Sequence, residues 1–186
     1  MKVFTENSCI CPGSCIFLSG VNGVGKTTLC NSVAHQLKVT HLTASSLLDR
    51  NAVSIAGGES EFICQRIEEI LLSEPFLLVD GHFVLSDSQG KLCLVDTEIY
   101  RRIKVIGIIV LIDSVKNIQN RLEKRDTRQV DRLFLKNLQD AELKHSEGVA
   151  RELNIRRLII DVSQNDFALR VSEVQRFIGP FLNAPV

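Results

Sequence analysis

The chain has 186 residues, of which 45% are hydrophobic and 24% are charged, so it is long enough for one substantial core and falls outside the disordered and fibrous classes. Twenty-two basic residues balance 22 acidic ones, so no overall field draws the protein to nucleic acid or to an anionic membrane. These properties predict one domain over residues 1–186 and no general nucleic-acid binding.

The N-terminal segment, MKVFTENSCICPGSCIF, has an early glutamate and lacks the apolar centre of a secretory signal. No stretch of the chain approaches the roughly 18 apolar residues of a spanning helix. We therefore expect a cytoplasmic protein without a membrane partner and without disulfides. Cys9, Cys11 and Cys15 form C-x-C-x3-C, but no Cys or His pair follows at zinc-finger spacing, so we expect free thiols there.

Strand and helix patterns alternate along the first half of the chain. The short apolar run 15–19 is typical of a buried parallel strand, and residues 26–37 have apolar positions at helical spacing. A second strand is predicted at 39–42, and serines after it begin a short helix that runs to about residue 50. Residues 61–72 then place four apolar side chains on one helical face.

The second half continues this alternation. Two apolar patches between residues 83 and 95 flank Asp87-Ser88-Gln89-Gly90 and predict a hairpin. Helices are expected over 115–153, with a break near 126–127, and over 166–178. Because strands and helices alternate, we predict a three-layer α/β/α domain around a five-stranded, mostly parallel sheet, with the hairpin as a small insertion. The remaining three strands are predicted at 76–79, 104–112 and 155–162.

Residues 20–27 read Gly-Val-Asn-Gly-Val-Gly-Lys-Thr and match the phosphate-binding pattern G-x-x-x-x-G-K-[ST] in full, between a predicted strand and a predicted helix. Glycines let main-chain amides surround phosphate oxygens, and the helix N-terminus adds its positive dipole end. Lys26 is expected to reach the β- and γ-phosphates and the Thr27 hydroxyl to ligate Mg2+. The pattern predicts a P-loop NTPase that uses ATP and Mg2+. The predicted nucleotide-binding residues are Gly20, Asn22, Gly23, Val24, Gly25, Lys26, Thr27 and Thr28.

P-loop proteins also need a carboxylate at the end of a neighbouring buried strand, near the metal. Asp80 closes the predicted strand 76–79 and meets this requirement, because strand ends face the ligand crevice in parallel sheets. We therefore predict Asp80 as a catalytic residue and, with Thr27, as a metal ligand. Asp113 follows the next apolar strand and is interpreted instead as part of a helix cap.

The strings FLSGVNGVGKTTL, HLTASSLLDR, FLLVDGH and RLEKRDTR occur in this order. Together they resemble the small nucleoside-monophosphate kinases, especially archaeal-type adenylate kinase and the adenylate-kinase-like ATPases. The resemblance implies a five-stranded parallel core, phosphoryl transfer from ATP to a nucleotide acceptor, and a lid that closes over the donor.

The resemblance also implies an acceptor-binding segment over about residues 43–72. In bacterial adenylate kinases this segment contains a Thr-Gly pair and an arginine that binds the acceptor phosphate, whereas here the polar residues are offset by about one position. Arginine is suited to this role because its planar fork binds phosphate in a bidentate manner. The predicted acceptor-binding residues in the segment are Ser45, Ser46, Arg50 and Arg66.

Arginines recur at spacings of four, three and four over residues 121–132, where the family has its lid. On a continuous helix they would lie on one side, facing the transferred phosphate and stabilising its charge. The alternative is an exposed helix with salt bridges, because acidic residues are interleaved. We predict catalytic lid roles for Arg121, Arg125 and Arg128; Arg132 completes the spacing.

His82, two residues after Asp80, distinguishes the possible functions. A nucleotide acceptor is already an anion and needs no base, whereas a histidine here would orient water for ATP hydrolysis or contact the acceptor. Three hypotheses therefore stay open: a nucleoside-monophosphate kinase, which leads; an ATPase switch acting on a protein or RNA partner; and a kinase of a small hydroxyl metabolite. The last would need Asp49 or Asp80 as its base.

Overall fold

The computed structural model describes residues 13–48, 58–87, 89–126, 131–164 and 166–182. It contains a five-stranded sheet, a separate two-stranded hairpin, six α-helices and one short 3-10 helix within these ranges. The elements, in chain order, are β1 (Ser14–Ser19), α1 (Lys26–Leu37), β2 (Thr40–Thr43), η1 (Ala44–Leu47), α2 (Gly58–Leu71), β3 (Phe76–Asp80), β4 (Val84–Ser86), β5 (Leu92–Leu94), α3 (Thr97–Arg102), β6 (Val105–Ile112), α4 (Val115–Asp126), α5 (Arg132–Leu153), β7 (Arg156–Asp161) and α6 (Phe167–Leu182).

The main sheet has the strand order β2-β3-β1-β6-β7, and every neighbouring pair is parallel. The strands are short runs of aliphatic residues, as expected where both faces of a sheet are covered. In the register, Leu18 of β1 lies beside Asp80 of β3, which in turn lies beside Thr43 of β2. All five strands therefore end at one edge of the sheet, which is where ligands bind in such folds.

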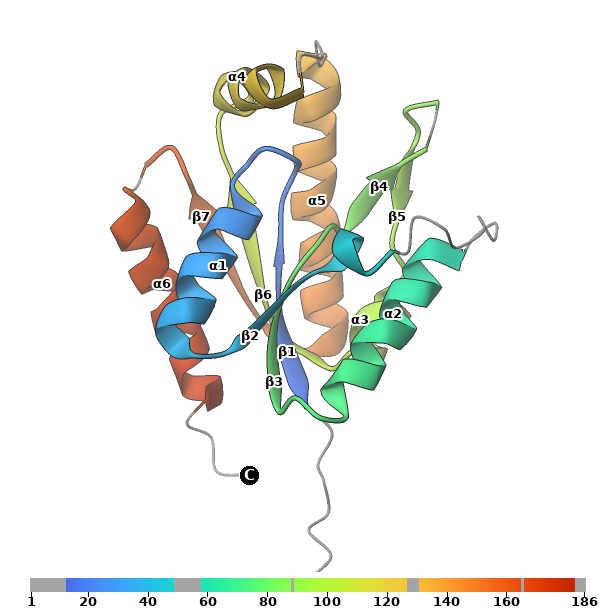
Figure 1. Cartoon of the computed structure of the whole chain (residues 1–186). Helices are drawn as coiled ribbons and strands as arrows, with labels where there is room; N and C mark the ends of the chain where they lie inside the picture. Colours follow the sequence, from blue (N-terminus) through green and yellow to red (C-terminus); the bar gives the residue numbers. More distant parts are fainter. Residues whose placement is uncertain (1–12, 49–57, 88, 127–130, 165, 183–186) are drawn as a thin grey trace, which may run out of the picture.

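Helices cover both faces of the sheet (Figure 1). Helix α1 packs against α6 on one face, while α3 packs against α2 and α5 on the other, and α4 lies beyond the ends of the central strands. The core is continuous from the strands into these helices, with fully buried side chains such as Ile16, Leu78 and Ile108. The predicted five-stranded three-layer P-loop fold is therefore confirmed.

The hairpin is where the sequence predicts it, and α4 and α5 are separate helices on the two sides of the predicted break. Strands β4 and β5 pair antiparallel beside the N-terminal half of α5 (Figure 1), and α4 ends at Asp126. One detail differs from the prediction: the helix expected after β2 is a 3-10 turn over its first residues. Cys93 of β5 is exposed, because one face of this two-stranded hairpin faces solvent.

In the described part of the chain, no helix combines the length and the apolarity that crossing a membrane requires.

Candidate active site at the carboxyl edge of the sheet

The phosphate-binding loop connects β1 to α1, as the pattern predicts. Its three glycines all have positive φ, with values of 140°, 81° and 108° at Gly20, Gly23 and Gly25. A Cβ atom at Gly23 would lie 2.9 Å from Leu122, so the loop also packs too closely on α4 to hold a side chain there. The Val24 side chain is buried and Thr28 is exposed. This shape presents main-chain groups at the start of α1 and fits a bound phosphate chain.

Lys26 lies inside this loop and is 7% exposed. Its Nζ donates to the carbonyl oxygens of Gly20 at 2.7 Å and Val21 at 3.3 Å. Burial lowers the pKa of Lys26 from an ordinary value near 10.5 to about 8, although the carboxylates of Glu142 and Asp80 act in the opposite direction. Without a ligand, the ammonium group therefore loses its proton above about pH 8, within the range of ordinary assays.

This lowered pKa predicts that ATP affinity depends on pH. Below pH 8 the ammonium is present before binding; above it, binding requires uptake of a proton, because phosphate oxygens favour the charged form. Affinity should therefore fall as the pH rises, by roughly tenfold between pH 7 and pH 9 for a single site of this kind. Calorimetry across this range measures the effect. Lys26→Arg, which stays charged, should lose the dependence, and an unchanged slope in that variant would contradict the explanation.

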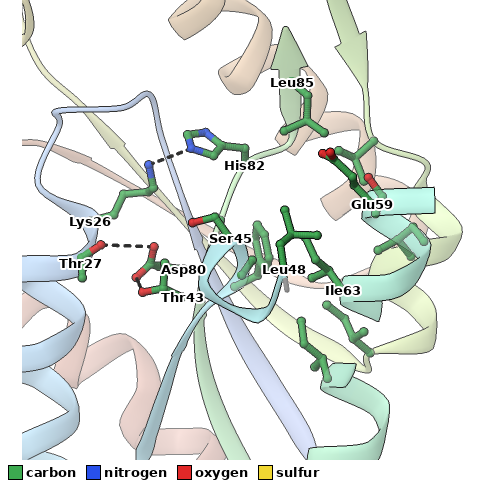
Figure 2. A pocket seen from close by; sticks show the side chains of 18 of the residues that line it. Lys26, Thr27, Thr43, Ser45, Leu48, Glu59, Ile63, Asp80, His82 and Leu85 are labelled. Atoms are coloured by element: carbon green, nitrogen blue, oxygen red, sulfur yellow. Dashed lines mark hydrogen bonds between the residues drawn. The ribbon is translucent and has the colours of Figure 1, made fainter. Parts of the chain in front are cut away.

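Asp80 ends β3 and is 2% exposed. Its Oδ2 accepts hydrogen bonds from Thr43 Oγ1 at 2.9 Å and from His41 Nε2 at 2.7 Å. Its Oδ1 lies 3.5 Å from the Thr27 hydroxyl, the interaction drawn in Figure 2. Burial by itself would raise the pKa of Asp80, but the hydrogen bonds from His41 and Thr43 hold it below its usual value. Asp80 is therefore an anion fixed beside Thr27, and the two oxygens suit a Mg2+ ion or its water shell.

His41 is held from both sides, because its Nδ1 lies 2.8 Å from Asn31 Oδ1 while Nε2 contacts Asp80. The Cys30 thiol is fully buried beside this pair, and ligand atoms of Cys30, His41 and Asp80 lie within 4.8 Å of one another. Burial, followed by the charge of Asp80, raises the pKa of the Cys30 thiol. The thiol therefore stays protonated. His41 and Thr43, which donate hydrogen bonds to Oδ2, fix the orientation of the Asp80 carboxylate.

His82 follows β3 and reaches the phosphate-binding loop. Its Nε2 lies 3.1 Å from the Asn22 side chain and 3.4 Å from Lys26 Nζ (Figure 2). Its Nδ1 lies 3.2 Å from Glu142 of α5, a carboxylate whose side chain is 1% exposed. A buried acidic residue from a distant helix therefore connects to the loop through His82.

A cavity of about 420 Å3 opens beside these groups. Figure 2 shows its two sides: Lys26, Thr27, Asp80 and His82 gather on one, while Leu48, Ile63 and Leu85 form the other, with Glu59 at the start of α2 near them. The cavity has a charged end at the P-loop and an apolar body. The other lining residues are Phe17, Asn22, Thr43, Ala44, Ser45, Ser60, Ile67, Gly81, Val95, Ile99, Tyr100, Ile103 and Arg125.

Arg121 and Arg125 lie on α4, whereas Arg132 begins α5 after the extended N-cap residue Asp131, so these arginines do not share one continuous helix. Arg121 donates from Nε to the Gly23 carbonyl at 2.7 Å and pairs with Asp113. It therefore stabilises the phosphate-binding loop and does not line the cavity. Arg125 does line it. Arg128 lies outside the described residues.

Only some of the predicted acceptor-binding residues that the structure describes line the cavity. Ser45 lines the cavity, whereas Ser46 does not and donates to the Thr43 carbonyl at 2.6 Å. Arg66 lies on the exposed face of α2, where it pairs with Glu69, and does not line the cavity, because its position on the helix points it away from the sheet. Arg50 and Asp49 lie outside the described residues, as do Cys9 and Cys11. Cys15 is buried in β1.

Sequence reasoning missed Glu142, His41 and Tyr100. Glu142 carried a usable signal, because it falls on the same helical stripe as Leu135, Leu138 and Val149, which are buried. A carboxylate on the apolar face of a helix requires a buried partner. His41 and Tyr100 carried no pattern, because their partners come from other elements.

Solved structures share this fold at low sequence identity. A gluconokinase from Sinorhizobium meliloti is similar with a TM-score of 0.57 and 15% identity, over 93% of this chain and 98% of that one. A shikimate kinase from Bacteroides thetaiotaomicron has a TM-score of 0.55 and 17% identity, over 89% and 98% of the two chains. A shikimate kinase from Acinetobacter baumannii, in complex with shikimate, has a TM-score of 0.57 and 18% identity, over 92% and 96%.

These identities establish a shared fold, that of P-loop kinases, and do not single out the adenylate kinases that the sequence resembles. No curated protein matches the sequence. A family model described as an AAA domain matches residues 19–139, which run from the end of β1 into α5 and include the phosphate-binding loop, Asp80 and His82. The chain therefore belongs to this AAA-domain family of P-loop proteins.

Proposed function

We propose that this chain is a phosphotransferase that moves the terminal phosphoryl group of ATP to a small molecule held in the cavity. The observation that carries the proposal is that one cavity is lined both by P-loop residues and by side chains of η1, α2 and α3. Donor and acceptor would meet at the charged end, where positioning and electrostatics supply most of the catalysis in this chemistry.

The roles of the loop residues follow from their geometry. Main-chain amides at the start of α1 bind the phosphates, and the Lys26 ammonium exchanges its contacts with Gly20 and Val21 for phosphate oxygens. Thr27 and Asp80 would hold Mg2+, which, when bound, neutralises charge on the phosphate oxygens. Arg125, on the lining, is suited to contact the transferred group.

The acceptor is either a nucleoside monophosphate or a small hydroxyl compound. The resemblance to nucleoside-monophosphate kinases supports the first. The second is supported by the lining itself: among the described lining residues, the arginine and lysine side chains are Lys26 and Arg125, both at the P-loop end, and Arg66 points elsewhere. An acceptor that already carries a phosphate needs further cationic side chains to bind that phosphate, whereas a hydroxyl compound does not.

ATP hydrolysis is a second candidate function, supported by the position of His82. Its Nε2 lies 3.4 Å from Lys26 Nζ, where a water molecule would have the same access to the terminal phosphate as an acceptor.

An acceptor screen separates these functions. Purified protein with ATP and Mg2+ is incubated with each nucleoside monophosphate, with nucleosides, and with gluconate and shikimate, and ADP and phosphorylated product are both measured. We expect product with at least one acceptor and ADP release that depends on it. ADP release that no acceptor changes would support hydrolysis, and ATP binding without turnover would contradict both functions.

A further inference from the structure

We propose that His82, oriented by the buried carboxylate of Glu142, is the base that takes the proton of an acceptor hydroxyl, and that the acceptor is an alcohol attached to a planar ring. This inference rests on the proposed phosphotransferase function and names the class of its acceptor. It uses Glu142, which the chemistry of the P-loop does not require.

Glu142 is the described acidic residue with the lowest exposure, at 0%. Both of its carboxylate oxygens accept from the Phe83 amide at 3.1 Å, and Oε1 also accepts from the Val84 amide at 3.3 Å. A carboxylate is buried at this depth only when several donors surround it. Helix α5 therefore fixes the segment that carries His82 and places the Glu142 carboxylate beside the imidazole ring.

The contact with Glu142 determines which nitrogen of His82 carries the proton. Glu142 Oε1 already accepts from two main-chain amides, so it acts as an acceptor toward Nδ1, 3.2 Å away, and Nδ1 carries a hydrogen. Lys26 Nζ only donates, so Nε2, 3.4 Å away, faces it with a lone pair. The structure places Asn22 Oδ1 3.1 Å from Nε2, and exchanging the oxygen and nitrogen of this amide, which have the same shape, turns a donor toward the ring. In this tautomer the ring directs its unprotonated nitrogen at the P-loop.

The backbone around His82 is fixed as well. The buried Tyr100 hydroxyl donates to the His82 carbonyl at 3.0 Å, and the preceding Gly81 amide donates to the Leu18 carbonyl at 3.0 Å. A Cβ atom at Gly81 would lie 2.7 Å from the Phe17 ring, so the chain passes close to the core at this point. Groups from β1, α3 and α5 therefore hold the ring in place before any ligand binds, as catalytic bases require.

In this arrangement, phosphoryl transfer to the acceptor is coupled to transfer of the acceptor proton to His82. The acceptor oxygen forms a bond to the γ-phosphorus of ATP, while the bond between that phosphorus and the bridging oxygen of ADP breaks. The acceptor O–H bond breaks, and its proton moves to His82 Nε2, whose positive charge is stabilised by Glu142 through Nδ1. The imidazolium returns the proton to solvent after the products leave.

The apolar part of the cavity limits the rest of the acceptor. Away from the P-loop end, its walls include Ile63, Ile67, Ile103 and Leu85. A polyol would leave its other hydroxyls unpaired against such walls, at about 1–3 kcal/mol for each group. A molecule that carries its hydroxyls only at the end near His82, and a planar ring at the other end, avoids this cost, and Glu59 offers an acceptor for a donor on the ring. Nucleosides, whose hydroxyls are all on the sugar, fit this description better than gluconate or shikimate.

The test replaces Glu142 by glutamine in the full chain. The amide oxygen can still accept from Phe83, Val84 and Nδ1, because all three face Oε1, but the negative charge that stabilises the imidazolium is lost. We expect kcat with a nucleoside to fall about 100-fold, while the KM for ATP changes less than about threefold. The nitrogen spectrum of labelled His82, assigned with His82→Asn, should show the proton on Nδ1 in the native protein and also in the variant, whose amide oxygen still accepts from it.

Glu147→Gln is the matched control, since this glutamate lies on the same helix and its side chain is 55% exposed. It should leave kcat and the histidine spectrum unchanged. A proton on Nε2 in the native protein, or full kcat in Glu142→Gln, overturns the role of the pair while leaving phosphotransfer intact. Transfer to monophosphates or polyols but not to nucleosides overturns the acceptor class. Absence of transfer to every acceptor overturns the proposed function itself, and the inference with it.

Discussion

Replacement of Lys26 by alanine is expected to lower phosphoryl transfer on the order of 1,000-fold and to weaken ATP binding. Lys26 is the buried cation of the loop, and its Nζ already lies 2.7 Å from a loop carbonyl, so the charge is held in position before the nucleotide arrives. A preorganised charge in a water-excluded site is worth far more than the same charge in solvent. Initial rates at saturating ATP, with calorimetric affinity, measure both effects.

The fold should survive this change, because Lys26 Nζ donates to two loop carbonyls and a water molecule can take its place in the variant. Thermal unfolding checks this, and Lys26→Met supplies a variant that keeps the side-chain volume. Lys144→Ala, on the exposed face of α5, is the control and should retain native rates. Native transfer in both Lys26 variants would contradict the assignment of the loop as the donor site.

Replacement of Asp80 by asparagine should remove most of the Mg2+ dependence and lower transfer on the order of 100- to 1,000-fold. The change keeps the shape but removes the anion that His41 and Thr43 hold beside Thr27. The affinity for ATP without metal should change little, because the P-loop amides and Lys26 remain. Calorimetry with and without Mg2+, and rates across a Mg2+ titration, separate metal binding from nucleotide binding.

Asp161→Asn is the matched control for this experiment. Asp161 ends β7 at the same edge of the sheet, but its Oδ1 accepts hydrogen bonds from Ser163. The side-chain oxygen of asparagine can accept the same hydrogen bonds. Its Mg2+ titration should match that of the native protein. If Asp80→Asn also keeps the native titration, Asp80 does not hold the metal.

Local patterns predicted the architecture well because the parallel strands are unbroken apolar runs and the helices have amphipathic spacing. The strand β6 and the loop between Gly20 and Thr27 are identified from their own residues, since glycine geometry and the helix start depend on neighbours in sequence. The position of Asp80 also follows from local reasoning, because a residue at the end of a buried parallel strand must lie at the ligand edge.

The arginines show where this reasoning fails. Regular spacing predicted one helical face over 121–132, but spacing cannot reveal that α4 ends at Asp126 or that Arg121 has a partner in Asp113. Arg66 was chosen for its charge, yet its place on α2 turns it toward Glu69 and solvent. A side chain's role depends on which way its element faces, and long-range packing decides that.

The sequence by itself determined that this chain has a P-loop α/β fold with a phosphate-binding loop, because those features need only residues that are adjacent in the chain. Only the tertiary structure decided which groups surround the loop. Glu142 lies 60 positions from His82 and 116 from Lys26, and it meets them because α5 packs beside β6 and the β4 segment. Contacts across such separations arise from burial of the whole core, and no local pattern encodes them.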